Sequence, residues 1–504
     1  MKKQRSVYIY DESSDSILLR NSFLQLVRSS GFEGFDYFLI NKWAGVENEV
    51  CFEDLNDEEI MALRKRAHRN FNKAIKGKNV ANSRTIRKWF GYDEPALPKR
   101  ETLFRLVFAL GLTSEETSDY LVNGMLEPSF QINDYRELIY MYGLDNRLTY
   151  EDCTRMIAVY EKSAHYDTEY IQGNHTAQLW EMYGINKNSL PEEFLEWMLQ
   201  NEAMFKGYSK TVLDCFIKLT DDIQECIKSD AREYLHELVT ENGYNEWKKN
   251  GGRNGDMQEL VPGFIRRLLR LDREEDKVKL AKSMKNAYSL AYGESRNTNI
   301  IKNIYMHENL LNSISGMENF VNKTIGTSFA SRTDKYMSQI LSVSVQKSYQ
   351  MQLRIILSYL GELDDNATCP EEIVNLLEEH GVVMTKCKNV GSCLRKVNSL
   401  LTNQTQNCEL IGRDDILPLV HYLSQRQYAN MMREDNVLYD MEQARNHFEN
   451  LANAILNRCQ MALISPEYRL DYLMLSSYCK EDMYSLVEMM EAIADFGRMT
   501  DAGR

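Results

Sequence analysis

The chain has 504 residues, a formal net charge of −14 and a hydrophobic fraction of 43%, which suffices for roughly two to four packed domains and argues against disorder throughout. No apolar run approaches the length of about 18 residues that a membrane-spanning helix needs, and the basic start lacks the apolar core of a secretory signal. The ten cysteines are scattered without a C-x-x-C pair, which favours a reducing cytoplasm.

The composition favours helices along the whole chain. Only 8 residues are proline, and several of these stand where a helix would begin, as at Pro191 and Pro370, where the missing N–H costs nothing. The alternation of apolar and polar residues that marks half-buried strands is scarce. We therefore predict an all-α fold.

The first part of the chain carries several short predicted helices. Residues 15–45 suggest two of them, and residues 58–77 suggest a highly basic one. Asn82 or Ser83 can cap a further helix, which runs to Phe90 and ends before a glycine.

The helices that follow have clear boundaries. Pro98 opens a helix that ends at Gly111. Thr113 and Glu116 form a T-x-x-E capping box at the start of the next helix. Two more helices can be capped by Asn133 or Asp134 and by Thr149.

Beyond residue 165 the pattern stays helical but is less sharply divided. The segment 248–256 has three glycines, two asparagines and no apolar residue, so we expect a linker there. The expected division is an N-terminal helical segment (1–57), a basic domain with a helical extension (58–165), a helical domain (166–247), the linker (248–256) and a C-terminal helical domain (257–504).

Positive charge is concentrated in one window of this acidic chain. Residues 64–105 hold thirteen Lys or Arg and three acids, a net charge of +10, so the other residues carry −24. Such a patch concentrates positive potential, and any nucleic-acid binding should be confined to it, because an acidic body repels phosphate. The alternative interpretation is that these cations pair with the chain's own acidic surface or form a solvated helix face.

The stretch 83–90, SRTIRKWF, combines an apolar face with basic faces. Ile86, Trp89 and Phe90 are three and four residues apart and share one side of a helix. The other sides carry the cations Arg84, Arg87 and Lys88. A short helix of this kind suits the DNA major groove, which is about 12 Å wide.

Two neighbouring segments supply the candidate DNA contacts. The candidates for groove or phosphate contact are Ser83, Arg84, Arg87 and Lys88. Lys99 and Arg100 lie at a helix N-terminus, where backbone N–H groups also favour phosphate, and are the candidates for contact with the DNA backbone.

The pattern S-x-T-I-x-x-W, followed by a proline-containing loop and an apolar helix that ends in A-L-x-L, resembles the second half of the Cro/phage-repressor (XRE-type) helix-turn-helix. The matching residues are Ser83, Thr85, Ile86, Trp89, Pro98, Leu103, Leu106, Ala109, Leu110 and Leu112. The resemblance covers about residues 60–145. It implies an XRE-like bundle followed by a multi-helix C-terminal body, binding of double-stranded DNA as a homodimer, and a bacterial source.

The sequence carries no signature of catalysis or of a bound cofactor. None of the eight histidines lies at zinc-binding spacing from a cysteine, and no Gly-rich phosphate loop or nucleophile elbow is present. We expect no metal, no cofactor and no catalytic residues. A second basic helix, 264–285, mixes eight cations with four acids, which fits an ion-paired surface helix that could add nonspecific phosphate contacts.

Three functions stay open at this level. The first is a cytoplasmic DNA-binding transcriptional regulator, whose helical body serves as a sensor or oligomerisation domain and can take a protein partner. The second is a helical adaptor protein that no longer reads DNA, because Gly77 lies nine residues before Ile86, further than the family's turn places it. The third is an enzyme without a recognisable signature.

Overall fold

The computed structural model describes most of the chain, and within the described residues every regular element is a helix. The described residues are 34–45, 55–92, 96–167, 176–271, 275–305, 332–385, 387–405, 410–466, 468–480 and 482–490. Their only sheet-like contacts are two isolated bridges, Thr368 with Asn389 and Tyr478 with Met483. The predicted all-α class is therefore confirmed.

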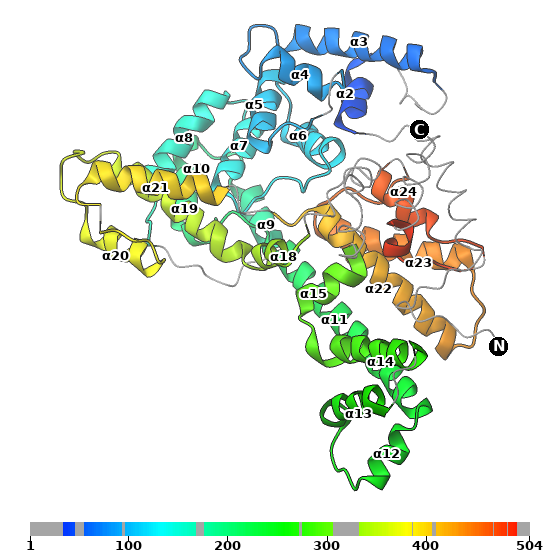
Figure 1. Cartoon of the computed structure of the whole chain (residues 1–504). Helices are drawn as coiled ribbons and strands as arrows, with labels where there is room; N and C mark the ends of the chain where they lie inside the picture. The colour runs from blue at the N-terminus through cyan, green and yellow to red at the C-terminus, as the bar shows by residue number, and fades with distance from the viewer. Residues whose placement is uncertain are drawn as a thin grey trace.

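The N-terminal helices form a head, shown in blue and cyan in Figure 1. They are α2 (Phe35–Trp43), α3 (Asp57–Ala74), α4 (Ser83–Trp89), α5 (Arg100–Leu110), α6 (Ser114–Asp119), the π-helical turn η2 (Tyr120–Gly124), α7 (Tyr135–Asp145), α8 (Tyr150–Ser163), α9 (Thr176–Asn186) and α10 (Pro191–Gln200). One apolar core joins these helices, from Phe35 to Phe205.

Most of the predicted helix boundaries in the head are confirmed. The side chains that accept a backbone N–H at the start of α4, α6, α7 and α8 are Asn82, Thr113, Asp134 and Thr149. Pro98 lies just outside α5, which begins at Arg100 after its cap Lys99, and Gly111 ends that helix with a φ of 73°. Of the two helices expected in residues 15–45, the second is α2 and the first lies outside the described residues.

The apolar face predicted for α4 is the side that the helix buries. Ile86 is 5% exposed, Trp89 is 1% exposed and Phe90, which caps the helix C-terminus, is fully buried. These three side chains belong to the core of the head. The polar face of α4 is consequently turned outward.

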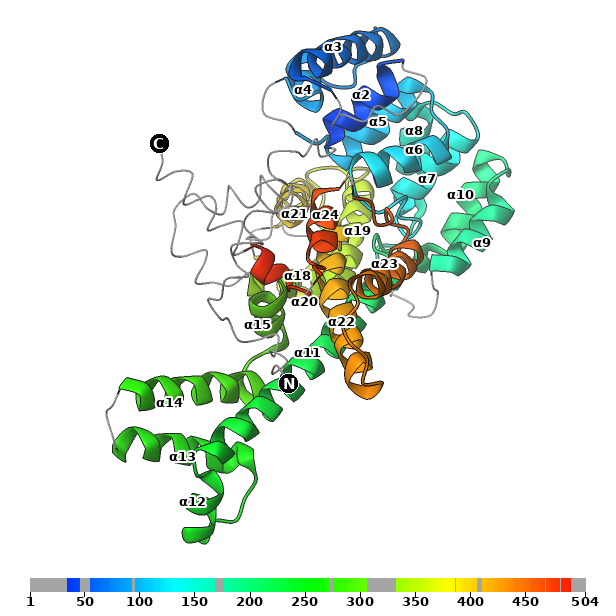
Figure 2. The same ribbon diagram turned by 90° about the vertical axis from the view of Figure 1, so that its right-hand side faces the viewer.

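The helix α11 (Lys210–Glu241) connects two further cores. Its first half packs in the body core with α15 (Arg296–Ile300), η5 (Ile301–Tyr305), α18 (Asp334–Leu341), α22 (Arg413–Glu434), α23 (Met441–Arg458) and α24 (Arg469–Ser476). Its second half packs with α12 (Tyr244–Asn250), α13 (Met257–Leu271) and α14 (Glu275–Tyr288) around a separate core. We call this second unit the arm, and Figures 1 and 2 both show it projecting from the rest of the molecule.

A fourth, smaller core lies beside the head. It is formed by α19 (Val343–Leu360), α20 (Glu371–Glu379) and α21 (Val390–Thr405). The side chains of Met351 and Ile355 on α19 belong to the head core, so α19 links the two units.

The domain boundaries in the structure differ from the expected ones. Residues 248–256 are no linker between domains. They are the end of α12 and its connection to α13 inside the arm, where the guanidinium of Arg253 lies 4.1 Å from the centre of the Trp247 ring. The glycines therefore mark a turn within one core. The expected domain 166–247 is divided, because α9 and α10 pack in the head whereas α11 packs in the body and the arm.

Candidate nucleic-acid interface

The helices α3 and α4 are fixed to α2 by polar and apolar contacts. The Nη2 atom of Arg64 on α3 lies 3.4 Å from Oδ2 of Asp36 on α2, and both side chains are largely buried. The rings of Phe71 on α3 and Phe90 after α4 pack edge to face, with centroids 5.3 Å apart. These contacts set the direction in which the outer faces of α3 and α4 point.

The outer face of α3 and the turn that follows it carry four cations, which we call the α3 cations. They are Lys65, Arg69, Lys73 and Lys76. The first three are spaced by four residues along one side of the helix, the fourth lies just beyond its C-cap, and all four are exposed. None of them forms a hydrogen bond or an ion pair with another described residue. Like charges four residues apart repel each other by a few tenths of a kcal/mol, and only Lys73 lies in the last turn of α3, where the helix dipole favours a cation.

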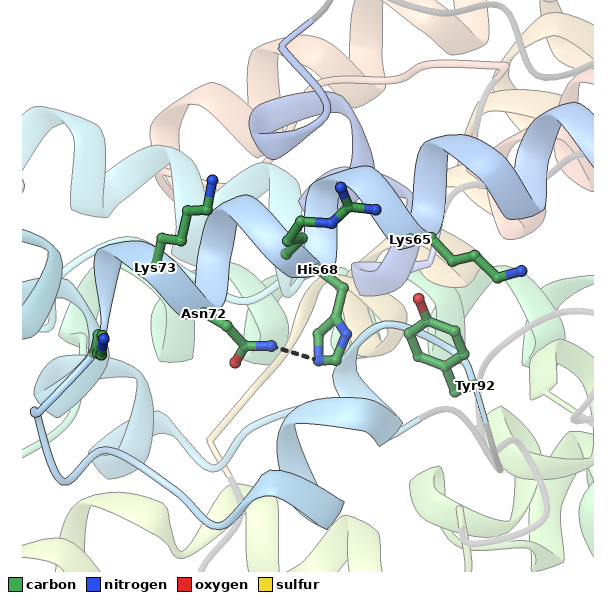
Figure 3. Close-up of a pocket in the computed structure, with 7 residues that line it drawn as sticks. Lys65, His68, Asn72, Lys73 and Tyr92 are labelled. Atoms are coloured by element: carbon green, nitrogen blue, oxygen red, sulfur yellow. Dashed lines mark hydrogen bonds between the residues drawn. The ribbon is translucent and has the colours of Figure 1, made fainter.

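The α3 cations line an open hollow of about 500 Å³ together with three other side chains. The other lining residues are His68, Asn72 and Tyr92. Figure 3 shows Lys65 and Lys73 extending outward from α3, while His68 and Tyr92 face each other beneath the helix. The hollow thus presents a row of cations above an aromatic floor.

The floor of the hollow is held by ring contacts and is uncharged at neutral pH. The His68 ring lies 5.2 Å from the Tyr92 ring, and Nε2 of His68 is 3.0 Å from the amide nitrogen of Asn72, which can donate to it. Burial and the nearby charge of Arg87 lower the pKa of His68. Burial raises the pKa of Tyr92 against the opposing effect of the neighbouring arginines. The positive charge of the hollow therefore comes from Lys and Arg alone.

The residues expected to contact DNA from α4 lie on or near the same surface of the head. Ser83, Arg84 and Arg87 are exposed, and Lys88 is half-buried. The guanidinium of Arg87 lies 4.8 Å from the centre of the Tyr92 ring, which joins the outer face of α4 to the floor of the hollow. Arg84 forms no ion pair or hydrogen bond with the described residues.

The prediction for Arg100 is corrected by its surroundings, whereas Lys99 beside it is exposed. The five N–H groups of the Arg100 guanidinium make five hydrogen bonds of 2.6–3.0 Å. Their acceptors are the carboxylates of Glu137 and Glu127 and the carbonyls of Pro128 and Ser129. Burial alone would lower the pKa of Arg100, but the two carboxylates outweigh it and raise the pKa. Arg100 has no donor left for phosphate and instead ties α5 to α7.

Four other cations of the basic window are also used inside the head. Arg64 pairs with Asp36, and Nη2 of Arg66 donates to the carbonyl of Gly45 at 3.0 Å. The other two are Lys78, which donates to the carbonyl of Ala109, and Arg105, whose guanidinium lies 5.7 Å from the centre of the Tyr150 ring. These four cations therefore serve the chain's own structure. The α3 cations do not, and their exposure fits both a ligand-binding surface and the solvated helix face considered above.

The α3 cations were not among the candidate site residues, although the sequence contains the signal for them. The helix 58–77 was predicted and was recognised as basic. The missing step was to place its cations on the helix, where the intervals of four, four and three residues select one face. The candidate site residues were instead placed on α4, because its apolar face was easier to recognise in the sequence.

No protein-family model, no curated protein and no solved structure matches the chain. Among the described residues, no helix is both long and apolar enough to cross a membrane. The same residues hold no cluster of three or more His, Cys, Asp or Glu side chains arranged to bind a metal ion.

Proposed function

We propose that the chain is a DNA-binding protein that regulates transcription in the cytoplasm of a bacterium and binds double-stranded DNA as a homodimer, without enzymatic activity. The α3 cations contact phosphates, and the outward face of α4, with Ser83, Arg84, Arg87 and Lys88, lies at the major groove. Lys99 adds a contact to the DNA backbone. The XRE-like resemblance supports this arrangement, because α4 stands where that family carries its recognition helix.

One observation carries the proposal. Thirteen cations occupy the window 64–105, and the structure separates those that bind partners inside the head from the α3 cations, which have none among the described residues. Three of these cations repel each other along α3, and Lys76 lies just beyond its end. A polyanion along the helix would relieve that repulsion while releasing its own counterions. The other residues together carry −24, so this window is the most positive part of the sequence.

The test compares two variants with the same change in net charge. The α3 variant carries Lys65→Glu, Arg69→Glu, Lys73→Glu and Lys76→Glu. The control variant carries Lys187→Glu, Lys218→Glu, Lys388→Glu and Lys480→Glu, at exposed positions outside the head surface described above. The measurement is fluorescence anisotropy with random-sequence duplex DNA over a range of salt concentrations.

The α3 variant should bind far more weakly, and the slope of log K against log salt should become shallower by roughly 3 to 4, because about 0.9 is lost for each phosphate contact. The control variant should keep most of the slope and affinity. Circular dichroism of both variants checks that they fold. Equal affinities and slopes for the α3 variant and the wild type would overturn the proposal.

A second candidate function is a helical adaptor, and one observation favours it. The connection from α3 to α4 spans residues 75–82, longer than the three- or four-residue turn of a helix-turn-helix. An adaptor whose α3–α4 surface binds a protein would show no salt-dependent binding to random duplex DNA. The same anisotropy experiment therefore decides between the two functions.

A further inference from the structure

The arm carries a second group of exposed cations. Arg267 and Arg270 on α13 and Lys282 and Lys285 on α14 are all exposed. None of the four forms a hydrogen bond or an ion pair with another described residue. Residues 264–285 contain eight cations and four acids, a net charge of +4 in an acidic chain. The two helices run antiparallel (Figure 2), so Arg270 lies near the start of α14, where Asp276 is an exposed acid, and Lys282 and Lys285 lie further from that turn.

The position of the arm separates these cations from the α3 cations. Figures 1 and 2, which differ by a turn about the vertical axis, both place α3 at one end of the molecule and α12 to α14 at the other. The 32 residues of α11 alone span roughly 48 Å at 1.5 Å per residue. A duplex of about 12 base pairs is only roughly 41 Å long, so one that lies across α3 does not extend to the arm.

The chemistry of the arm surface fits phosphate better than lipid. The apolar side of α13, with Val261, Phe264 and Ile265, is buried in the arm core and is not available to enter a membrane. Leu269 and Val278 are each 44% exposed and stand singly among charged residues. In each helix two cations lie three residues apart, roughly 4.5 Å along the axis, which is comparable with the spacing of phosphates along a strand.

We propose that the α13–α14 surface binds the phosphate backbone of a second duplex segment, so that one molecule bridges two segments of DNA. This inference rests on the proposed function of the head. The continuous helix α11, which packs in both the body core and the arm core, holds the two surfaces apart. Bridging requires that separation, because two surfaces side by side would bind a single duplex.

The test uses the full-length protein and two duplexes of about 12 base pairs, one immobilised on beads and one fluorescent. The measured quantity is the amount of fluorescent duplex that the protein captures on the beads. The arm variant carries Arg267→Glu, Arg270→Glu, Lys282→Glu and Lys285→Glu, and the control variant defined above has the same net charge. Anisotropy with a single duplex is measured in parallel, and light scattering gives the oligomeric state.

The arm variant should lose capture by roughly tenfold or more at low salt while it keeps the tight binding of a single duplex. The control variant should capture DNA as the wild type does. A homodimer can also bridge two duplexes through two α3 surfaces, a route that the arm variant retains, so capture is compared at a protein concentration at which light scattering shows monomers. Undiminished capture by the arm variant would overturn the inference and leave the proposed function intact.

The remaining outcomes separate the two proposals. If the α3 variant binds a single duplex as the wild type does and the arm variant loses binding, the head proposal fails and the arm is the DNA-binding surface. If the arm variant keeps capture but no longer self-associates, the arm binds the acidic surface of a second copy and the DNA inference fails. If the wild type binds no duplex at low salt, both proposals fail.

Discussion

Arg100 and Lys99 are adjacent in the sequence and have opposite surroundings. Removing the Arg100 side chain would leave the buried carboxylate of Glu137 without a cation and with only the backbone N–H of Gln131 as a donor, and would remove a donor from the carbonyls of Pro128 and Ser129. We predict that Arg100→Ala lowers the free energy of unfolding by roughly 3 to 5 kcal/mol, as for other broken buried ion pairs. Lys99→Ala should change it by less than about 0.5 kcal/mol. Urea denaturation of both variants checks this, and equal stabilities would contradict the structural role of Arg100.

His421 is a buried neutral histidine in the body core, and its titration is linked to stability. Burial lowers its pKa from 6.5 to about 3, and its Nε2 lies 2.8 Å from Oγ of Ser477. The unfolded histidine gains a proton as the pH falls below about 6.5, whereas the folded one stays neutral, so stability is present above pH 6.5 and is lost progressively towards pH 3.

Between pH 7.5 and pH 5.5 this single group should cost about 1.4 kcal/mol of unfolding free energy. His421→Gln keeps a donor for Ser477 but does not titrate, so it should lose less stability over that interval. The measurement is the urea midpoint of the two proteins at both pH values, because other titrating groups are common to both. An identical pH dependence would show that His421 is not buried in the neutral form.

At the scale of the element, the turn after α4 depends on a glycine for two separate reasons. Gly91 has a φ of +65°, and a Cβ there would lie 2.5 Å from the Asp36 carboxylate. Gly77, after α3, has a φ of +79° but open space around it. Gly77→Ala should therefore cost roughly 1 kcal/mol for the left-handed backbone alone. Gly91→Ala should cost at least about twice as much, because it also displaces Asp36 from Arg64. Amide hydrogen exchange in α2 and α4 measures both.

Local signals in the sequence predicted most of the helix ends in the head, because caps such as Asn82 and Thr113 act within a few residues. The apolar face of α4 was predictable for the same reason. The buried hydrogen bonds of Arg100 were not predictable from the sequence, because their acceptors lie at positions 127–137. The packing of α5 on α7 brings those acceptors to Arg100. The glycines of 248–256 indicated a break in a helix, but whether a break separates two cores depends on distant contacts.

The same distinction applies to charge. A count over the window 64–105 gave the correct net value but could not separate Lys78, which donates to the carbonyl of Ala109, from Lys76, which has no partner among the described residues. Charge in a sequence window is therefore an upper limit on the charge that a surface can offer to a ligand. The α3 cations are four of the eight cations of the window that the head offers as candidate phosphate contacts.

At the scale of the whole molecule, a −14 chain that binds DNA must do so through few contacts. The candidate contacts on the head are the α3 cations together with Arg84, Arg87, Lys88 and Lys99. For one protomer on a short duplex, these eight contacts set a limit of roughly −7 on the slope of log K against log salt, at about 0.9 per phosphate. Repulsion from the acidic remainder weakens as salt rises, which makes the observed slope shallower than this limit.

We therefore predict a slope between roughly −4 and −7 for a duplex of about 12 base pairs bound to the arm variant, in which the second surface is removed. A longer duplex that can reach both ends of the wild-type molecule should give a steeper slope. For the arm variant, the slope with the longer duplex should equal the slope with the short duplex. Anisotropy titrations at four or more salt concentrations provide these slopes. A slope well beyond the limit for the short duplex would mean that cations outside the head bind phosphate, because no rearrangement of eight contacts can release more counterions than eight phosphates hold.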